Sequence, residues 1–530
     1  QSIKKMVGEM GLELSYDKQL KGKNGYKVYQ TDANGYALVD GTLREKDPTN
    51  GNDLYLTIDS GLQRNLDYLM SNAYSESGAE VVTAGVMEIK TGKILAMSTY
   101  PSFNPNERNI STFNNYFLEG TIECGSVFKP FIYADSIEEG KYDHNAYYNS
   151  GSYNVYYGNK LVATIKDHNG GQGWGTITYD QGLYHSSNVA ICNLLDQGYV
   201  TKDVLTEKLN DLGFFQGDTM DGLTCSSSIN AYTRKNAGRL EYLTTGFGQG
   251  STVTPYQLLK AYSVFGNDGK TVQPHIVDKV VNPETNKVVY QATPKYSKQI
   301  FSTNTISQVK DLMLGVIEDE QGTGKTYRLD NDVRMIGKTG TGQVVENGGY
   351  STTLYMHSFV GIAPYDDPQV VMFLTFKSGD SYAQYMPNIV KQTMNEALQV
   401  VNRYNAKNTT AVDQSCTLDS YTNQSVNYVK SKLESKSLSV QIIGNGSSVI
   451  EQYPLAKSKV TSGDKVFIKT EGKDITLPNL IGWSKKEVQT YASLAGIQLT
   501  IDGTSGHVTA QSVGENTVVH SGDSLTVAIS

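Results

Sequence analysis

An internal repeat near the end of the chain restricts its fold more than any other feature of the sequence. Ser462-Gly463-Asp464 matches Ser521-Gly522-Asp523, and the matches around this pair share one offset of 59 residues (522 − 463 = 59). A sequence that recurs at a constant spacing is typical of a structural module present in more than one copy. We therefore predict two consecutive small domains of the same fold, residues 411–472 and 473–530.

Each copy has the pattern of a small α+β unit. Helical patterns cover Ser425–Leu433 in the first copy and Ser484–Ala495 in the second. Short strand-like runs and the Ser-Gly-Asp turn follow, and a closing strand is predicted at Val466–Lys469 and again at Leu525–Ile529. The repeat thus fixes the fold class of the C-terminal part of the chain.

The rest of the chain needs at least one larger domain, because 530 residues exceed what a single hydrophobic core usually serves. We expect residues 53–405 to form one mixed α/β domain and residues 1–52, which are polar and glycine-rich, to be the remnant of a larger module. The strand-like segments of the large domain are Val81–Ile89, Lys93–Ser98, Thr353–Ala363 and Gln369–Phe376. Helical patterns lie between them.

Charge and cysteine content exclude several classes of function. The chain has 46 Lys and Arg against 54 Asp and Glu, a net charge of −8, and no cluster of basic residues, so nucleic acid is not expected as a partner. The sequence contains no stretch of about 18 apolar residues, so no membrane span is predicted. The four cysteines, at 124, 192, 225 and 416, are too few for a disulfide scaffold.

A Ser-x-x-Lys pattern at Ser126 and Lys129 is the first candidate for catalysis. The same spacing occurs at five serines in the chain, so the pattern alone carries little weight. At Ser126 the context is specific, because Gly125 precedes it and Val127–Ile137 predicts a buried helix that tolerates Pro130 in its first turn. Both side chains would then share one face of that helix.

This arrangement favours nucleophilic catalysis without a histidine. A serine at a helix N-terminus feels the positive end of the helix dipole, and a partly desolvated lysine has a lowered pKa. Lys129 could then accept the proton of Ser126, which would form an acyl-enzyme. The alternative is an N-cap serine beside a solvated lysine.

Two further motifs have the same kind of context. Ser186-Ser187-Asn188 opens an apolar helix at 189–195, where a hydroxyl could relay a proton and an amide could hold a peptide carbonyl. Lys338-Thr339-Gly340-Thr341-Gly342 follows the strand-like Val333–Ile336, and an edge strand there could bind an extended peptide. The other Lys-Thr-Gly, at 90–92, has the composition of a hairpin turn.

Three motifs in this order, starting at Ser126, Ser186 and Lys338, are those of β-lactamases and penicillin-binding proteins. Over nearly its whole length the chain resembles class B high-molecular-weight penicillin-binding proteins, and its repeats resemble PASTA domains, the second most clearly. The segments that carry this resemblance are Gly11-Leu12-Glu13, Leu56-Thr57-Ile58-Asp59, Gly248-Gln249-Gly250, Thr254-Pro255-Tyr256-Gln257 and Leu477–Ser484.

The resemblance implies a fold and a function. Residues 53–405 would form a transpeptidase domain with an antiparallel sheet flanked by helices, and residues 1–52 would be the end of an N-terminal pedestal. The reaction would be D,D-transpeptidation, in which Ser126 attacks a D-Ala-D-Ala carbonyl of a peptidoglycan stem peptide and an amine of a second stem resolves the acyl-enzyme. β-Lactams would acylate the same serine.

The resemblance also implies a role for each motif residue. Lys129 would be the general base, Ser186 a proton relay and Asn188 a ligand of the substrate amide. The segment Lys338, Thr339, Gly340 and Thr341 would bind the terminal carboxylate of the substrate. Backbone N–H groups of Ser126 and Thr341 would form the oxyanion hole.

Partners and location follow only from the resemblance. The family is anchored by an N-terminal transmembrane helix that this chain lacks, so the parent protein is expected at the extracytoplasmic face of the membrane. A membrane glycosyltransferase of the SEDS type is the expected partner. A role in cell shape, in division or in sporulation remains open.

The chemistry requires no cofactor, but the sequence departs from the family at Cys124, where proline is usual. If the motifs converge, Cys124 and His185 would be neighbours, and Asp167 and His168 lie just upstream of the same helix. These four residues could hold a structural zinc ion. The alternative is a small buried cysteine and hydrogen-bonded histidines.

Competing functions share the motifs. A serine β-lactamase would need a further carboxylate to activate water, and Glu207 is the only candidate. A D,D-carboxypeptidase would use the same acyl-enzyme. A binding protein that senses β-lactams or muropeptides is the alternative from a different class.

Overall fold

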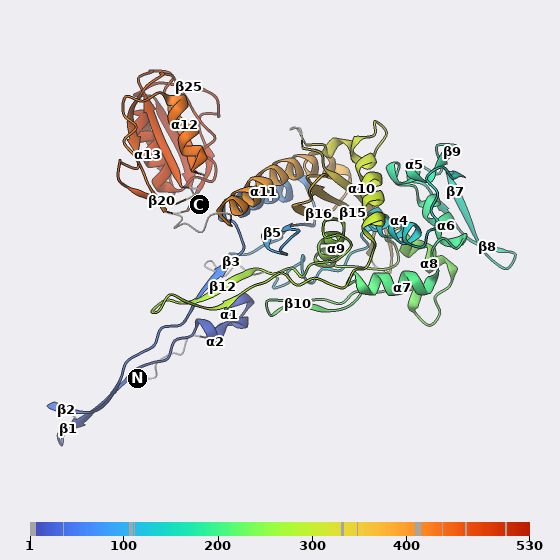
Figure 1. Ribbon diagram of the computed structural model, residues 1–530, viewed down its shortest axis with the longest axis horizontal. Coiled ribbons are helices and arrows are strands. Elements are labelled where there is room, and N and C mark those ends of the chain that lie inside the picture. The colour runs from blue at the N-terminus through green and yellow to red at the C-terminus, as the bar shows by residue number, and fades with distance from the viewer. Residues whose placement is uncertain are drawn as a thin grey trace. The chain divides into compact units, whose positions relative to one another are not determined.

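The computed structural model describes the chain except for residues 1–6, 35, 105–109, 111, 330–332, 347, 409–414, 437, 462–463, 504–505 and 530. The chain divides into two compact units, Gln1–Val401 and Asn402–Ser530, which Figure 1 colours from blue to orange and from orange to red. In the described part, no helix is both long and apolar enough to cross a membrane.

A five-stranded sheet organises the first unit. Its order is β14-β15-β16-β4-β5, and every neighbouring pair is antiparallel, so β14 is an edge strand. The strands are β4 (Val81–Glu88), β5 (Ile94–Tyr100), β14 (Ile336–Glu346), β15 (Gly349–Ala363) and β16 (Val370–Ser378). The prediction of an antiparallel sheet is confirmed.

Both faces of this sheet are buried, as the alternation along β16 shows. Val371 and Phe373 belong to one hydrophobic cluster, whereas Met372 and Leu374 belong to another. Successive side chains of a strand point to opposite faces, so each cluster fills one face of the sheet. The sequence of β16 is continuously apolar because helices cover both faces of the sheet.

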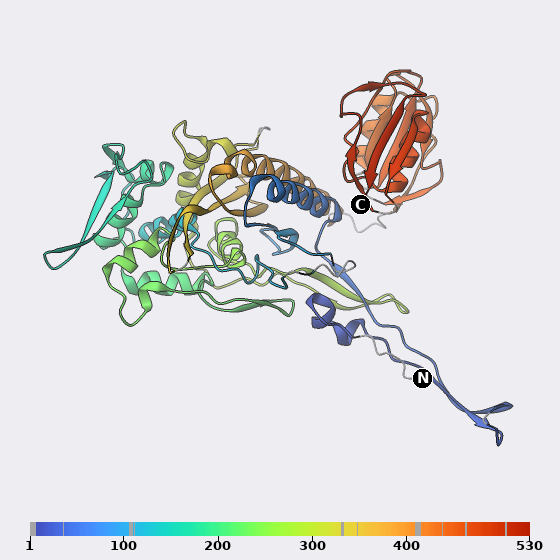
Figure 2. The same cartoon turned by 180° about the vertical axis from the view of Figure 1, so that it is seen from behind.

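Helices flank the sheet as predicted. On one face lie α3 (Ser60–Ser77) and α11 (Met386–Asn408), which run side by side in Figures 1 and 2. The opposite face is covered mainly by α4 (Lys129–Glu138), α9 (Pro255–Tyr262) and α10 (Thr303–Glu318). The three sequence motifs that begin at Ser126, Ser186 and Lys338 lie on this second side.

Shorter elements complete the first unit. The helices are α5 (Tyr179–Tyr184), α6 (Asn188–Asp196), α7 (Lys202–Asp211) and α8 (Arg239–Gly246). The hairpins and small pairs are β6 (Tyr147–Asn149) with β9 (Thr176–Thr178), β7 (Ser152–Tyr157) with β8 (Lys160–Lys166), and β10 (Asp218–Met220) with β11 (Leu223–Cys225).

The N-terminal segment contains α1 (Gly11–Ser15), α2 (Asp17–Leu20) and the antiparallel pair β1 (Tyr26–Thr31) and β2 (Ala37–Lys46). β3 (Asp53–Leu56) then joins a small sheet with β12 (Val277–Asn282), which also pairs with β13 (Lys287–Gln291). This small sheet connects the start of the chain to a segment that follows α9.

The second unit contains the two repeats, and each is α+β as predicted. Helix α12 (Val426–Ser435) or α13 (Lys485–Ala495) accompanies a three-stranded sheet, of order β18-β21-β19 or β23-β26-β24. The strands are β18 (Ser439–Ile443), β19 (Val449–Tyr453), β21 (Lys465–Thr470), β23 (Gln498–Asp502), β24 (Val508–Gln511) and β26 (Ser524–Ile529). Two small pairs complete the unit, β17 (Ser415–Thr417) with β20 (Lys459–Thr461) and β22 (Ile475–Thr476) with β25 (Val518–Val519). Of the predicted Ser-Gly-Asp turns, Ser462-Gly463 lies outside the described residues.

The repeat offset has a structural counterpart at single residues. Gln511 Oε1 accepts the Leu480 N–H at 2.7 Å, and Gln452 Oε1 accepts the equivalent N–H of the first repeat at 2.7 Å. Gly482 has φ +81°, and at the equivalent position of the first repeat Asn423 has φ +66°. Asparagine is the side chain that best tolerates this left-handed conformation, so the first repeat keeps the turn without the glycine.

Candidate active site

The nucleophile candidate lies in a tight turn at the start of α4. Residues Gly125–Phe128 form one 3₁₀ turn, and α4 continues from Lys129 with Pro130 in its first turn. Ser126 is part-buried and lines a cavity of about 710 Å³. The predicted helix is present, but the serine itself lies in the 3₁₀ turn that precedes it.

Three backbone segments cross closely at this turn. The Gly125 N–H donates to the Gly248 carbonyl at 3.0 Å. On the other side β14 passes so near that a Cβ at Gly342 would lie 1.7 Å from the Glu123 carbonyl oxygen, and a Cβ at Gly340 2.7 Å from that of Cys124. Glycine is required at these positions because any side chain would displace the nucleophile's turn.

The second motif is held in a strained conformation between α5 and α6. Ser186 has φ +58°, which costs about 1–2 kcal/mol for a residue other than glycine. Ser187 caps α6 by accepting the Ala190 N–H at 3.0 Å. Asp167 then fixes this cap, because its Oδ1 accepts from Ser187 Oγ at 2.9 Å and from Val189 N–H at 3.1 Å.

Two buried lysine amines converge on Ser186. Lys129 Nζ donates to the Ser186 carbonyl at 2.5 Å and lies 3.4 Å from its Oγ. Lys338 Nζ donates to Ser186 Oγ at 2.7 Å and to the Thr339 carbonyl at 2.9 Å. Neither lysine has any exposed surface, and no ion pair to either is found among the described residues.

Burial therefore weakens the basicity of both amines. Desolvation lowers the pKa of Lys129 from 10.5 to about 7, although the charge of Asp167 opposes this shift. Burial lowers the pKa of Lys338 well below its usual value, and the charge of Lys129 lowers it further. Burial thus disfavours two positive charges on this pair, and a pKa of about 7 lets Lys129 be neutral near pH 7.

The remaining predicted site residues surround the same cavity. Asn188 lines it and donates its amide to the Lys166 carbonyl at 2.9 Å. Thr339 Oγ1 donates to Thr323 Oγ1 at 2.8 Å, and Thr339, Gly340 and Thr341 all line the cavity. The structure thus brings the three motifs together around one hollow.

Other residues of this cavity carry no motif in the sequence. Thr323 belongs to no sequence motif, and its contact with Thr339 depends on the packing of α10 beside β14. Gln249 lines the cavity from the glycine-rich loop that resembled a family landmark. None of the described residues lining the cavity is Asp or Glu, whereas Lys166 and His168 are present.

The four predicted metal ligands lie in different surroundings. Cys124 is buried in the apolar core, with Sγ 3.8 Å from a backbone carbonyl oxygen. Asp167 uses both carboxylate oxygens in hydrogen bonds. The rings of His168 and His185 pack on Trp174, with centroid distances of 5.4 and 4.6 Å. Among the described residues no group of three or more His, Cys, Asp or Glu is arranged to hold a metal ion, so the zinc prediction gains no support.

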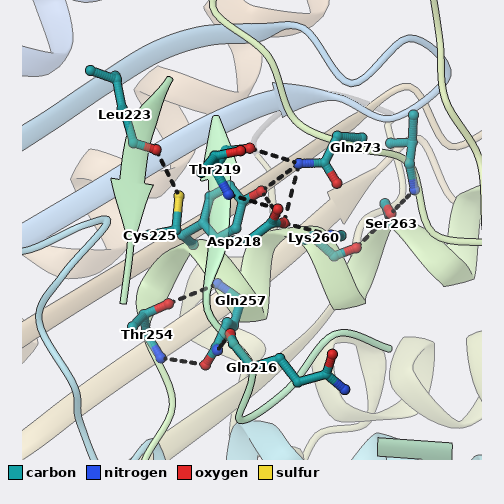
Figure 3. A network of polar contacts seen from close by, with 12 residues as sticks. Gln216, Asp218, Thr219, Leu223, Cys225, Thr254, Gln257, Lys260, Ser263 and Gln273 are labelled. Atoms are coloured by element: carbon teal, nitrogen blue, oxygen red, sulfur yellow. Dashed lines mark hydrogen bonds and ion pairs between the residues drawn. The ribbon is translucent and has the colours of Figure 1, made fainter. Parts of the chain in front are cut away.

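A second polar network of the same unit surrounds Asp218 (Figure 3). Its Oδ2 accepts from Lys260 Nζ at 2.7 Å, from the Tyr256 hydroxyl at 2.7 Å and from Gln273 Nε2 at 3.2 Å. Burial raises the pKa of Asp218, but the hydrogen bonds from Lys260 and Tyr256 outweigh it and leave the pKa below 3.8. This network ties the β10–β11 hairpin to α9.

Family models match almost the whole chain. The penicillin-binding protein transpeptidase domain matches residues 82–399, the penicillin-binding protein dimerisation domain matches residues 1–56, and the PASTA domain matches residues 417–472 and 475–530. The first repeat is therefore a PASTA domain although it lacks the Pro and Gly of the second.

Known proteins resemble the chain over similar lengths. Stage V sporulation protein D of Bacillus subtilis is 30% identical over 88% of this chain and 73% of its own length. A probable peptidoglycan D,D-transpeptidase PenA of Neisseria flavescens is 27% identical over 74% of this chain and 94% of its own length. The chain also aligns with the crystal structure of penicillin-binding protein 2X from Streptococcus thermophilus, over 99% of its own length and 78% of the length of that protein. The identity is 24% and the TM-score is 0.65, which supports the fold.

On these matches the chain belongs to the penicillin-binding protein transpeptidase family, with the family's dimerisation domain before the transpeptidase domain and two PASTA domains after it.

Proposed function

We propose that the chain is a serine-type peptidoglycan D,D-transpeptidase that cross-links stem peptides through an acyl-enzyme on Ser126. The observation that carries this proposal is the pair of buried amines, Lys129 and Lys338, that meet at Ser186 beneath the cavity that Ser126 lines. The names of the PenA relatives, which are probable peptidoglycan D,D-transpeptidases, support the same reaction.

Acylation uses the neutral form of Lys129. Ser126 Oγ attacks the carbonyl carbon of the penultimate D-Ala while Lys129 Nζ takes its proton, which a pKa of about 7 permits at neutral pH. Ser186 Oγ, which is bonded to Lys338, relays a proton to the departing D-Ala amine. An amine of a second stem then replaces Ser126 on the acyl carbon.

The donor peptide is proposed to lie along the free edge of β14. Strand addition at an edge gives an extended peptide backbone partners, and the terminal carboxylate reaches Thr339 and Thr341 on the cavity wall, with the buried amine of Lys338 behind them. This carboxylate restores the positive charge of Lys338, which the free site disfavours. The N–H groups of Ser126 and Thr341 form the oxyanion hole, with each donor contributing about 10²–10³ in rate.

A β-lactamase is disfavoured by the lining of the cavity. Such an enzyme needs a carboxylate to activate the deacylating water, and none of the described cavity residues is acidic. Glu207, the candidate named from the sequence, is exposed on α7 and does not line the cavity. We expect the acyl-enzyme formed with a β-lactam to be long-lived.

Labelling with a fluorescent penicillin tests the nucleophile. The parent protein should be labelled stoichiometrically and Ser126→Ala should not, while Ser307→Ala, at another Ser-x-x-Lys, should label like the parent. A label that persists in Ser126→Ala would overturn the proposal.

Product analysis separates the transpeptidase from its alternatives. With a thioester stem mimic and an acceptor amine, mass spectrometry should detect the aminolysis product. Hydrolysis alone would indicate a D,D-carboxypeptidase, and labelling without any turnover would indicate a sensor of β-lactams or muropeptides.

The biological setting is proposed from the family. The parent protein is expected to be membrane-anchored, to act at the extracytoplasmic face and to work with a SEDS-type glycosyltransferase. Among cell shape, division and sporulation, the name of the Bacillus subtilis relative favours sporulation. Expression restricted to spore formation would support this assignment, and expression throughout growth would contradict it.

A structural zinc ion at Cys124, Asp167, His168 and His185 stays a separate prediction, and no step of the proposed reaction depends on it. Elemental analysis of the purified protein tests it, with Cys124→Ser as the control. Stoichiometric zinc that is lost in the variant would support the site, and a parent protein without zinc would eliminate it.

A further inference from the structure

A second hollow, of about 510 Å³, lies beside the nucleophile's turn. Thr121, Ile122 and Glu123, which lead directly into that turn, form one wall. The other walls come from the end of β14 and from β4, β15 and β16. Gln343 of β14 lines both this hollow and the catalytic cavity, so the two are neighbours across one strand.

The two hollows differ in charge. The catalytic cavity is lined by Lys166 and His168 and, among the described residues, by no carboxylate. The second hollow is lined by Glu80, Glu123 and one cation, Lys377. Lys377 Nζ lies 2.5 Å from Glu80 Oε2 and 3.8 Å from Glu346 Oε1, so this cation is already paired, and no ion pair to Glu123 is found among the described residues.

Glu123 is 92% buried, since its exposed fraction is 8%. Its Oε1 accepts from the Tyr350 hydroxyl at 3.2 Å, whereas its Oε2 has no hydrogen-bond partner among the described residues. Burial raises the pKa of Glu123, and hydrogen bonds from the Gly250 N–H and the Tyr350 hydroxyl offset this only in part. A bound cation would offset the remaining cost of burying the carboxylate. Glu123 lies three residues before Ser126 in the chain, and Gln343 lines both its hollow and that of Ser126.

We propose that the second hollow is the acceptor subsite, in which Glu123 binds the primary ammonium group of the second stem peptide. This inference rests on the proposed function and assigns the site that receives its acceptor substrate. The charges agree with the two substrates, because the donor ends in a carboxylate and the acceptor brings an ammonium group. Apolar groups of Ile122, Val345 and Met356 line the space beside Glu123 and suit the aliphatic stem of that amine.

Aminolysis of the acyl-enzyme needs only the acceptor amine, Lys129 and Ser126. The bound ammonium loses one proton to solvent, and the free amine attacks the acyl carbon of the Ser126 ester. The new C–N bond forms as the bond from carbon to Ser126 Oγ breaks, and a proton of the amine passes through Lys129 to Ser126 Oγ. Glu123 is a binding residue that orients the acceptor and takes no part in acylation.

The experiment separates the two half-reactions. The donor is a thioester stem mimic, and the acceptor is a synthetic stem tripeptide with one free side-chain amine, with its N-acetylated form as the blank. Glu123→Gln should acylate with fluorescent penicillin within about twofold of the parent. Its ratio of aminolysis to hydrolysis should fall at least about tenfold, through a higher KM for the acceptor, because a buried charge partner of the ammonium is lost.

Two control variants bracket this result. Glu119→Gln removes the same charge four residues earlier in the chain, from a residue that does not line the hollow, and Tyr350→Phe removes the hydrogen bond to Glu123 but keeps its charge. Both should keep the parent ratio. An unchanged ratio in Glu123→Gln would overturn the inference alone, and so would a parallel loss of acylation, which would make Glu123 a support of the turn. A parent protein that transfers to no amine would instead overturn the proposed function.

Discussion

The cluster at Ser186 and the network at Asp218 contain the same kinds of groups, yet they do different work. At Asp218 the amine of Lys260 meets a carboxylate at 2.7 Å and joins two elements of the fold. At Ser186 two amines meet a hydroxyl and a carbonyl, and burial lowers the pKa of Lys129 to about 7. We expect an amine that is paired with a carboxylate to act structurally, and a buried amine without one to be available as a base.

The largest expected effect comes from removing each amine in turn. Lys129→Met should lower the rate of acylation by about 10²–10⁴-fold, the usual contribution of a general base, and should raise stability because a desolvated amine is removed. Lys260→Met should leave acylation nearly unchanged but destabilise the fold by about 1–3 kcal/mol, since Asp218 loses its partner. Labelling rates measure acylation by both variants, and urea denaturation measures their stability. Equal losses of activity would break the comparison.

A pH profile of acylation gives the next effect. Lys129 acts as a base only when it is neutral, so the rate should rise through about pH 7 and level off above it. Below this midpoint the rate should fall about tenfold per pH unit, because the neutral fraction does. A midpoint near the usual lysine pKa of 10.5 would show that the amine keeps its charge and would contradict the comparison.

The pH dependence of stability tests the Asp218 network. The pKa of folded Asp218 is depressed, so its ionised form stabilises the protein above the unfolded pKa of about 3.9. That stabilisation is lost as the pH falls through the lower, folded pKa. Asp218→Asn should cost about 1–2 kcal/mol near neutral pH and should flatten the acid limb of the stability curve. An unaltered acid limb would assign that limb to other carboxyl groups.

The smallest effect is expected at the longest of the three contacts. Gln273 Nε2 lies 3.2 Å from Asp218 Oδ2 and donates to the Tyr256 hydroxyl at 2.8 Å, but Lys260 and Tyr256 stay bonded to Asp218 without it. Gln273→Leu should therefore cost only about 0.5–1 kcal/mol in denaturation and leave labelling unchanged. A loss as large as that of Lys260→Met would show that the amide, and not the amine, holds this network.

The sequence predicts the elements and the motifs better than the contacts between them. The hairpin around residues 90–92, the helix after Ser126 and both repeat folds appear where their patterns place them. The strand expected from Val333 begins only at Ile336. A continuous apolar run such as β16 marks burial on both faces but does not say which strand lies beside it.

The partners of Lys129 illustrate what the sequence leaves open. Its amine bonds to Ser186, and this depends on the left-handed φ of a serine, which no residue pattern announces. The sequence predicts Asp167 as a metal ligand, whereas in the structure it fixes the cap of α6 through Ser187. Thr323 reaches Thr339 only through tertiary packing. Such contacts join segments far apart in the chain, so spacing cannot reveal them.

The close crossing of backbones at Gly340 and Gly342 limits how this protein can evolve under antibiotic pressure. A side chain at either glycine would collide with the segment that leads into Ser126, so we expect no drug-evading variants at these two positions. Substitutions that exclude a drug but keep the substrate must arise where side chains have room to change. Gln249 and Thr323, on the cavity wall, are the positions to monitor in resistant isolates.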